Sequence, residues 1–201
     1  MTALRSSTLV ATLAWPLLAS ASSVTVQVVS ANDKPLADAV VYLDSAEARA
    51  SVQPLKHAEI VQQQRRFVPK VSVIPLGSGV YFPNRDNVRH HVYSFSPAKV
   101  FELKLYAGTP AEPVVFDKPG IAALGCNIHD AMVAWVVVVE TPYYGRTDAE
   151  GRITLAQVPA GSYRLRAWHP DLPLGSPVSD AALQVDPVSA AAKVRLGITV
   201  K

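Results

Sequence analysis

The chain has 201 residues, 49% of them hydrophobic and 17% charged, which is enough length for one large or two small domains and excludes disorder. Its formal charge is only +3, and no basic cluster is larger than Arg65-Arg66, which argues against nucleic-acid binding. Sixteen prolines and many valine-rich runs favour an all-β fold over a helical bundle.

Residues 1–21 are expected to be a signal peptide. Arg5 provides the positive charge, residues 8–18 form a short apolar segment, and Ala19-Ser20-Ala21 fits a cleavage site. An uncleaved signal anchor is the alternative. No later apolar run is long enough to span a bilayer. We therefore expect a periplasmic protein with no stable membrane span after cleavage.

Short strands separated by turns are expected along the rest of the chain. Val24, Val26 and Val28 alternate with polar residues, which is typical of a half-buried strand. Residues 44–56 have no clear period and are interpreted as a linker. Further strands are predicted at residues 39–43, 70–75, 80–82, 90–95, 100–106, 114–116, 136–139, 152–155, 163–168, 184–186 and 193–200. This pattern predicts an all-β sandwich or barrel that needs no helix.

Cys126 is the only cysteine, so it cannot form an internal disulfide. His129 and Met132 follow it at intervals of three residues, directly before a strand. A thiolate, an imidazole and a thioether in one loop suit a trigonal copper site made of two histidines, a cysteine and a weak axial methionine. The missing histidine should lie upstream, on another strand.

Three other uses of Cys126 fit less well. A binuclear copper A centre would need a second cysteine where Ala122 stands, and a structural zinc site would need more Cys or His ligands and no methionine. A cysteine nucleophile would need an orienting acid and an open cleft, which the sequence does not indicate.

Two segments resemble the cupredoxins, and amicyanin and its relatives most closely. They are the run from Asn84-Arg85-Asp86 to His90-His91-Val92, and the loop Cys126-x₂-His129-x₂-Met132, which has the amicyanin spacing. The resemblance implies a cupredoxin Greek-key β-sandwich with one type 1 copper ion. By the same resemblance, His90, Cys126 and His129 would be its equatorial ligands and Met132 its axial ligand.

The position after the first histidine departs from that family. Its asparagine is replaced here by His91, which could itself be the ligand. Neighbouring side chains on a strand point to opposite faces, so only one of the two histidines should face the metal. The loop count favours His90.

A second resemblance concerns the C-terminal part. The carboxypeptidase-regulatory or transthyretin-like β-sandwich is resembled by two successive patterns, Thr147-Asp148-x-x-Gly151 and Pro159-x-Gly161-x-Tyr163-x-Leu165. The segment that usually starts this sandwich is found upstream, as Pro35-Leu36-x-x-Ala39-x-Val41. The resemblance implies that residues 22–55 are the first strands of this sandwich (or a linker), 56–141 an inserted cupredoxin domain, and 142–201 the remainder of the carboxypeptidase-regulatory-like sandwich. A tandem order of two domains, in which residues 24–55 belong to the first, is the alternative.

The whole pattern predicts a function. Val92-Tyr93-Ser94-Phe95-Ser96, the Cys126 loop and Trp168-His169-Pro170 resemble periplasmic proteins named for methylamine utilisation. We expect an exported type 1 copper protein, not an enzyme, that carries single electrons between partners such as a c-type cytochrome or a dehydrogenase. The alternatives are a periplasmic copper-carriage or adhesion-like binding module and, less favoured, a relative of multicopper oxidases or nitrite reductases.

Overall fold

The computed structural model describes residues 21–173 and 175–200. The predicted signal peptide lies outside these residues except for Ala21. Among the described residues, strands form five sheets and one short helix is present, so the prediction of an all-β fold is confirmed. No helix in this part of the chain has the length and apolar character needed to cross a membrane.

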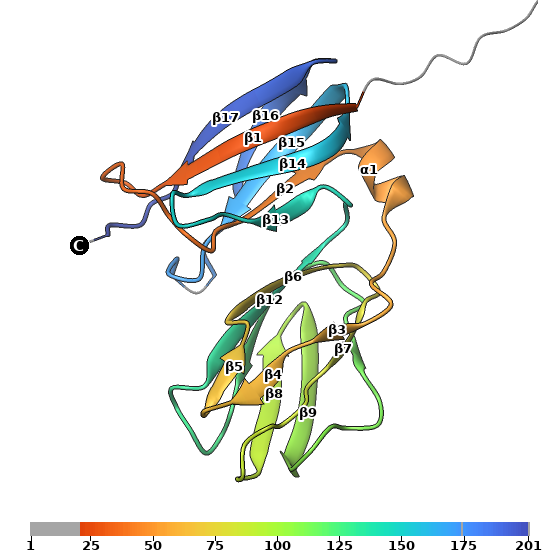
Figure 1. Ribbon diagram of the computed structural model, residues 1–201, viewed down its shortest axis with the longest axis vertical. Helices are drawn as coiled ribbons and strands as arrows, with labels where there is room; N and C mark the ends of the chain where they lie inside the picture. The colour runs from red at the N-terminus through yellow and green to blue at the C-terminus, as the bar shows by residue number, and fades with distance from the viewer. Residues whose placement is uncertain (1–20, 174, 201) are drawn as a thin grey trace, which may run out of the picture.

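The strands form two β-sandwiches stacked end to end (Figure 1). We call the upper one in Figure 1 the terminal sandwich, because its strands come from both ends of the described chain. One sheet has the order β14-β1-β17, and the other β13-β2-β15-β16. Their bounds are β1 (Ala21–Val29), β2 (Val40–Asp44), β13 (Tyr144–Arg146), β14 (Arg152–Pro159), β15 (Gly161–Trp168), β16 (Ser179–Val185) and β17 (Ser189–Arg195).

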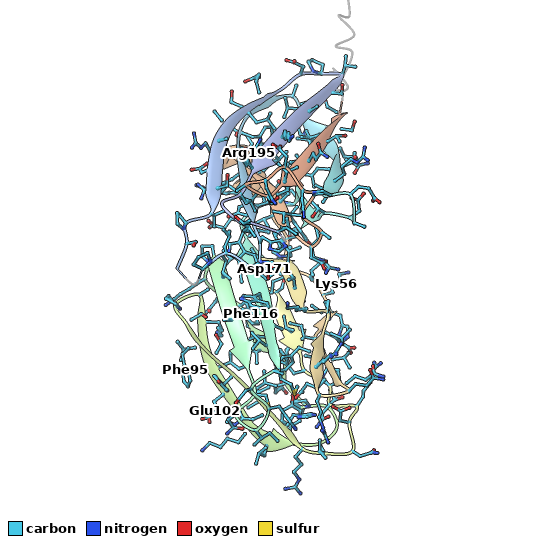
Figure 2. The ribbon with its side chains drawn as sticks, turned by 90° about the vertical axis from the view of Figure 1, so that its left-hand side faces the viewer. Lys56, Phe95, Glu102, Phe116, Asp171 and Arg195 are labelled. Carbon is cyan, nitrogen blue, oxygen red and sulfur yellow. The ribbon has the colours of Figure 1, made fainter. Side chains whose placement is uncertain are left out.

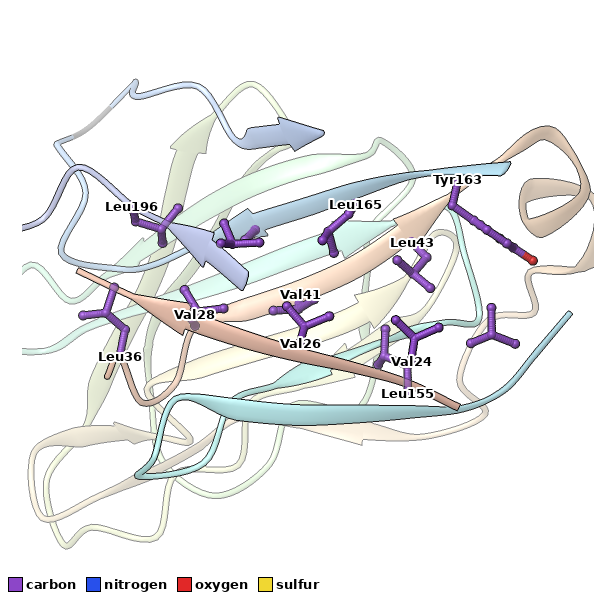
Figure 3. Close-up of a cluster of buried hydrophobic side chains, with 14 of the residues drawn as sticks. Val24, Val26, Val28, Leu36, Val41, Leu43, Leu155, Tyr163, Leu165 and Leu196 are labelled. Carbon is purple, nitrogen blue, oxygen red and sulfur yellow. The ribbon is translucent and has the colours of Figure 1, made fainter. Parts of the chain in front are cut away.

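The core of the terminal sandwich follows from the alternation seen in the sequence. Val24, Val26 and Val28 of β1 are fully buried, and they face Val41 and Leu43 of the opposite sheet (Figure 3). Because side chains alternate between the two faces of a strand, the intervening residue Thr25 is exposed. The predicted half-buried strand at this position is confirmed.

The lower unit in Figure 1, which we call the central sandwich, contains the strands between residues 58 and 139. Its main sheet has the order β6-β12-β11-β8-β9, and smaller sheets are formed by β10-β7-β3 and β4-β5. The bounds are β3 (Ala58–Glu59), β4 (Val61–Gln63), β5 (Arg66–Val68), β6 (Val71–Pro75), β7 (Gly79–Tyr81), β8 (His90–Ser96), β9 (Lys99–Tyr106), β10 (Val114–Val115), β11 (Gly120–Gly125) and β12 (Val133–Val139).

Side chains of the main sheet divide between a core and an outer face. Val92, Leu124 and Val136 pack in one buried cluster with Phe116, which Figure 2 shows within the central sandwich. Phe95 lies on the outer face, with 74% of its surface exposed. The main sheet therefore has one covered face and one face that is partly open.

The valine run at the end of β12 is buried on both faces, which explains why it shows no alternation. Val136 and Val138 point into the central core. Val137 and Val139 pack against Val40 and Trp168 of the terminal sandwich. β12 therefore joins the two sandwiches through an apolar contact.

The segment interpreted as a linker lies between β2 and β3 and contains a short helix, α1 (Ala46–Ser51), which was not predicted. The Ser45 side chain caps the helix by accepting a hydrogen bond from the Ala48 backbone N–H at 3.1 Å. Only Ala48 of the helix is buried, so no apolar period marks it in the sequence.

Gly151 occupies a turn that no other residue fits. Its φ is +70°, and an added Cβ would lie 2.5 Å from the Val28 carbonyl oxygen. We expect Gly151→Ala to lower the free energy of unfolding by roughly 3 kcal/mol, through both strain and overlap with the backbone. Urea denaturation measures this change.

Two other glycines, Gly175 and Gly197, provide controls for Gly151→Ala. Gly175 has a φ of +80° but open space around it, so Gly175→Ala isolates the strain, about 1–2 kcal/mol. Gly197 has neither feature, and Gly197→Ala should stay within about 0.5 kcal/mol of the wild type. If Gly151→Ala and Gly175→Ala lower the free energy of unfolding equally, the close approach of the added Cβ to the Val28 carbonyl does not destabilise the protein.

Candidate metal centre

The residues singled out in the sequence lie at the end of the central sandwich farthest from the terminal sandwich. β12 runs from Val133 at this distal end to Val139 at the contact with the terminal sandwich. Gly125 pairs with Val133, so Cys126 directly follows β11 at the distal end. His90 begins β8 at the same end, because Tyr93 of β8 pairs with Gly125.

The Cys126 loop is a short, hydrogen-bonded connection between β11 and β12. The His129 N–H donates to the Cys126 carbonyl at 3.4 Å, and the Met132 N–H donates to the His129 carbonyl at 2.9 Å. An added Cβ on Gly125 would lie 2.7 Å from the Tyr93 ring, so a larger residue there would have to displace that side chain. Tyr93 of β8 therefore crosses closely over the end of β11, directly before Cys126.

His90 is fully buried and only one of its ring nitrogens has a hydrogen-bond partner. Nε2 lies 2.8 Å from Oδ2 of Asp86, so the N–H is assigned to Nε2. In that neutral tautomer Nδ1 carries the lone pair, and this atom is buried with no partner among the described residues. Such an atom loses its hydration without replacement, which costs about 1–3 kcal/mol. An electrophile at this position would remove the cost.

Three ligand atoms converge here. His90, Cys126 and His129 each offer one donor atom, and these three atoms all lie within 4.8 Å of one another. The Cys126 Sγ is 3.9 Å from the His129 Nδ1, and the two imidazole centroids are 5.0 Å apart. Ligands about 2.0–2.3 Å from one ion lie roughly 3.5–4 Å apart at trigonal angles, so small shifts suffice to bind a single ion.

Burial differs among the four predicted ligands. Cys126 and Met132 are 4% and 1% exposed and belong to the same hydrophobic cluster. His129 is only partly buried. The thiolate and two imidazoles of the converging group are soft or intermediate donors, and such a set suits copper better than magnesium or calcium. The group can therefore hold one copper ion.

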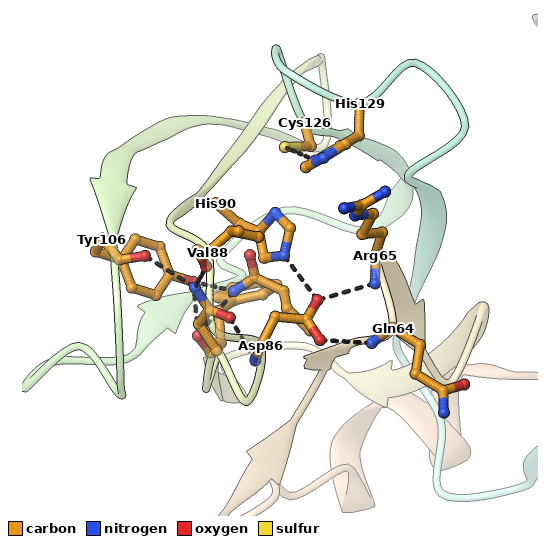
Figure 4. A network of polar contacts seen from close by, with 11 residues as sticks. Gln64, Arg65, Asp86, Val88, His90, Tyr106, Cys126 and His129 are labelled. Atoms are coloured by element: carbon orange, nitrogen blue, oxygen red, sulfur yellow. Dashed lines mark hydrogen bonds and ion pairs between the residues drawn. The ribbon is translucent and has the colours of Figure 1, made fainter.

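Asp86 connects His90 to a hairpin that the sequence did not reveal (Figure 4). Besides contacting His90, its two carboxylate oxygens accept the backbone N–H groups of Gln64 and Arg65, at 2.6 and 2.8 Å. Burial alone raises the pKa of Asp86, but the Arg65 N–H, His90 and the Gln64 N–H outweigh it and hold the pKa below its usual value. The carboxylate is therefore kept ionised beside the imidazole.

Gln64 and Arg65 form the tip of the hairpin between β4 and β5, with φ values of +54° and +56°. Both are in the left-handed region, which non-glycine residues rarely adopt. The Asp86 carboxylate offsets that strain by satisfying both tip N–H groups.

Asn84 and Tyr106 fix the loop that carries Asp86. The Asn84 amide donates to the carbonyls of Val88 and Tyr106, at 2.8 and 2.9 Å, and its Oδ1 accepts the Asp86 N–H at 3.0 Å. The Tyr106 hydroxyl donates to the Phe82 carbonyl at 2.6 Å and accepts from Gln62. Burial raises the pKa of Tyr106, so the phenol stays neutral. The loop before His90 is thus tied to β9.

The other described histidines lie outside the group. The His91 Nε2 is 3.0 Å from the Glu102 carboxylate, on the opposite face of β8 from His90. The His169 Nε2 lies 3.0 Å from the Ala37 carbonyl. His57 stacks on Tyr81, with 5.1 Å between the ring centroids. Each has a structural contact of its own.

Sequence reasoning missed the contacts of Asp86 with His90 and with the Gln64–Arg65 turn. The position of Asp86, four residues before His90, was an available signal, because a carboxylate so placed in a tight loop can return to the imidazole. The turn had no signal, since neither residue is the glycine or asparagine that marks such hairpins.

Solved structures with a similar chain arrangement include copper proteins. A purple cupredoxin from Nitrosopumilus maritimus is 24% identical, with a TM-score of 0.36, and the match covers 41% of this chain and 99% of that one. Amicyanin from Paracoccus versutus is 18% identical, with a TM-score of 0.36 and coverage of 49% and 97%. A copper-containing nitrite reductase from Thermus scotoductus is 23% identical, with a TM-score of 0.39 and coverage of 56% and 28%.

No protein-family model matches the chain, and no curated protein matches it. The structural similarities cover between 41% and 56% of the chain, and only 28% of the nitrite reductase chain is matched. The function therefore has to be inferred from the side chains of the site.

Proposed function

We propose that the protein is an exported type 1 copper protein that carries single electrons. His90, Cys126 and His129 would be the equatorial ligands, and Met132 the axial ligand. The observation that supports this best is the buried, unpartnered Nδ1 of His90, in a group whose donor atoms lie within 4.8 Å of one another. A neutral imidazole with its other nitrogen bonded to a carboxylate is the usual state of a metal-binding histidine.

A copper ion bound there would supply a one-electron couple. The chain's residues provide the rest of the mechanism. Burial of His90, Cys126 and Met132 excludes water from most of the site. Asp86 holds the His90 imidazole in one tautomer and orientation. His129 is the only partly exposed member and offers the shortest route for an electron to the surface.

An electron carrier agrees better with this donor set than an enzyme does. Four protein ligands would leave no position open for a substrate or a water molecule. Ligands held by two strand ends and one short loop would also rearrange little when the oxidation state changes, which favours rapid electron exchange. The proposed partners are periplasmic redox proteins, such as a c-type cytochrome or a dehydrogenase. A role in methylamine utilisation stays a prediction.

We also propose that residues 56–141 are a domain inserted into a carboxypeptidase-regulatory or transthyretin-like sandwich. Strand pairing supports this division, because β2 and β13 are neighbours in one sheet although the whole central sandwich lies between them in the sequence. A cleaved signal peptide over residues 1–21 and a periplasmic location complete the proposal.

Copper titration of the purified full chain tests the proposed function. We expect one equivalent of copper to bind and to give an intense visible absorption band from thiolate-to-copper charge transfer, and one-electron reductants to bleach it reversibly. A colourless copper complex would exclude a type 1 site. Colour without reversible reduction, together with release of copper to an acceptor protein, would favour the carriage alternative.

A further inference from the structure

Unpaired arginines gather at the distal end of the central sandwich. Six described arginines lie within 4 Å of a carboxylate: Arg49, Arg85, Arg146, Arg164, Arg166 and Arg195. Among the described arginines, four are in no such ion pair, and three of them are at this end: Arg65, Arg66 and Arg89; the fourth is Arg152. The weak overall charge of +3 therefore conceals a local excess of positive charge.

These three arginines belong to the segments that build the metal group. Arg65 and Arg66 are at the tip of the β4–β5 hairpin, and Arg89 directly precedes His90. All three are exposed. In Figure 4 the Arg65 guanidinium points from the hairpin toward His129. The loops that lie at or begin at this end also carry three carboxylates: Asp130 and Glu112, which are exposed, and Asp86, which is engaged by three N–H donors.

The position of Arg65 is built into the fold. Its backbone adopts a left-handed conformation, and its N–H is held by the same Asp86 carboxylate that contacts His90. A surface hollow of about 300 Å³ is lined by Gln64 and Arg65 of the hairpin tip and by residues 86–88. The arginine is thus carried on a fixed turn beside the group.

Two apolar side chains complete this surface. Val88 is 42% exposed and Ile128 is 48% exposed, and they lie in the loops before His90 and after Cys126. Apolar side chains with a charged rim are typical of protein–protein interfaces. We define the distal face as Arg65, Arg66, Val88, Arg89, Ile128 and His129.

We propose that the distal face docks an acidic protein that exchanges electrons with the site, and that Arg65 is the side chain that selects it. This inference rests on the proposed function. Carboxylates of the partner would pair with the arginines, while Val88 and Ile128 exclude water around His129. Because the arginines have no carboxylate partners within the described chain, they are available for a partner without breaking an internal ion pair.

The first experiment uses the metal-free full chain and a fluorescein-labelled octaglutamate peptide at low ionic strength. Amide chemical-shift changes are expected at residues 64–66, 87–89 and 127–131. Arg65→Glu should weaken binding at least about fivefold, because it reverses a charge that contacts the peptide. Arg152→Glu makes the same change of net charge in the terminal sandwich, and it should weaken binding less than about twofold.

The second experiment measures electron exchange of the copper-loaded chain with two small oxidants. Oxidation by the anion hexacyanoferrate(III) should slow with Arg65→Glu and with added salt, whereas oxidation by the cation tris(phenanthroline)cobalt(III) should speed up with both. Arg152→Glu should change neither rate appreciably. Equal effects of the two variants would show that only net charge matters and would overturn the proposal.

Two further outcomes are decisive. Arg65-dependent binding to phosphatidylglycerol vesicles, with no binding of octaglutamate, would assign the distal face to a membrane surface and overturn the proposal. Failure to form a coloured copper site, with the peptide still binding at the distal face, would remove the proposed function and the electron exchange but leave the acidic docking partner.

Discussion

Cys126→Ser is expected to abolish the visible absorption of the copper-loaded protein and to weaken copper binding by more than about 100-fold. This loss exceeds the 10–100-fold loss of metal affinity that is typical when a residue that only contacts a ligand is replaced. Cys126 is the only thiol in the chain, and its Sγ lies 3.9 Å from the His129 Nδ1. A serine hydroxyl is similar in shape but stays protonated at neutral pH and is a hard donor, so it replaces neither the charge nor the soft ligand. Absorption spectroscopy and competition with a copper chelator measure the two effects.

A control for this variant has to reproduce the burial of a hydroxyl. Cys126 is 4% exposed, so serine there costs about 1–3 kcal/mol of stability if its hydroxyl finds no partner. Ala134 is fully buried in the same hydrophobic cluster, and Ala134→Ser adds a hydroxyl without touching the thiol. Ala134→Ser should lose stability but keep its colour. If Cys126→Ser keeps the band as well, the thiolate is not a ligand.

Local patterns were sufficient to predict most of the secondary structure. Alternating residues such as Val24, Val26 and Val28 face a core, and the structure has the expected strand there. The pair His90 and His91 shows the same principle at the site, because adjacent strand residues point to opposite faces. His90 lies in the group with Cys126 and His129, while His91 contacts Glu102. Period and spacing carry this information because they depend only on backbone geometry.

Features that depend on tertiary contacts were not predictable in the same way. The run Val136 to Val139 shows no period, and only the packing of Val137 and Val139 against the terminal sandwich explains it. The Gln64–Arg65 turn violates the usual preference for glycine or asparagine, since its strain is offset by Asp86, some twenty residues later in the chain. Local propensity cannot report a compensation of that kind.

Asp86→Asn is expected to affect both stability and metal binding. The carboxylate accepts three N–H groups, from Gln64, Arg65 and His90, and hydrogen bonds to a charged group contribute about 1.5–3 kcal/mol each. An asparagine keeps one acceptor oxygen and turns the other into a donor, so we expect roughly 3 kcal/mol less stability. Copper affinity should fall about 10–100-fold, because the His90 imidazole loses its orienting partner. Urea denaturation and chelator competition measure these changes.

Asp148→Asn is a control for Asp86→Asn, because it removes the charge of a turn-holding carboxylate outside the site. Asp148 also holds a turn, since its Oδ1 accepts the backbone N–H groups of Glu150 and Arg152 at 3.0 and 2.7 Å. It lies in the terminal sandwich, remote from His90. Asparagine keeps this accepting oxygen, so Asp148→Asn should lower stability only slightly, through the loss of the negative charge, and should change neither the absorption band nor the copper affinity. A change in the band would mean that loss of a remote carboxylate charge is sufficient to perturb the site.

A second substitution separates the two roles of Asp86. Gln64→Gly removes the strain of a left-handed residue, because glycine adopts positive φ freely. In the Asp86→Asn background it should restore about 1 kcal/mol of stability. It should not restore copper affinity or the wild-type band, because His90 would still lack its carboxylate. If Gln64→Gly restores both, Asp86 acts on the metal site only by holding the hairpin, and its contact with His90 contributes nothing.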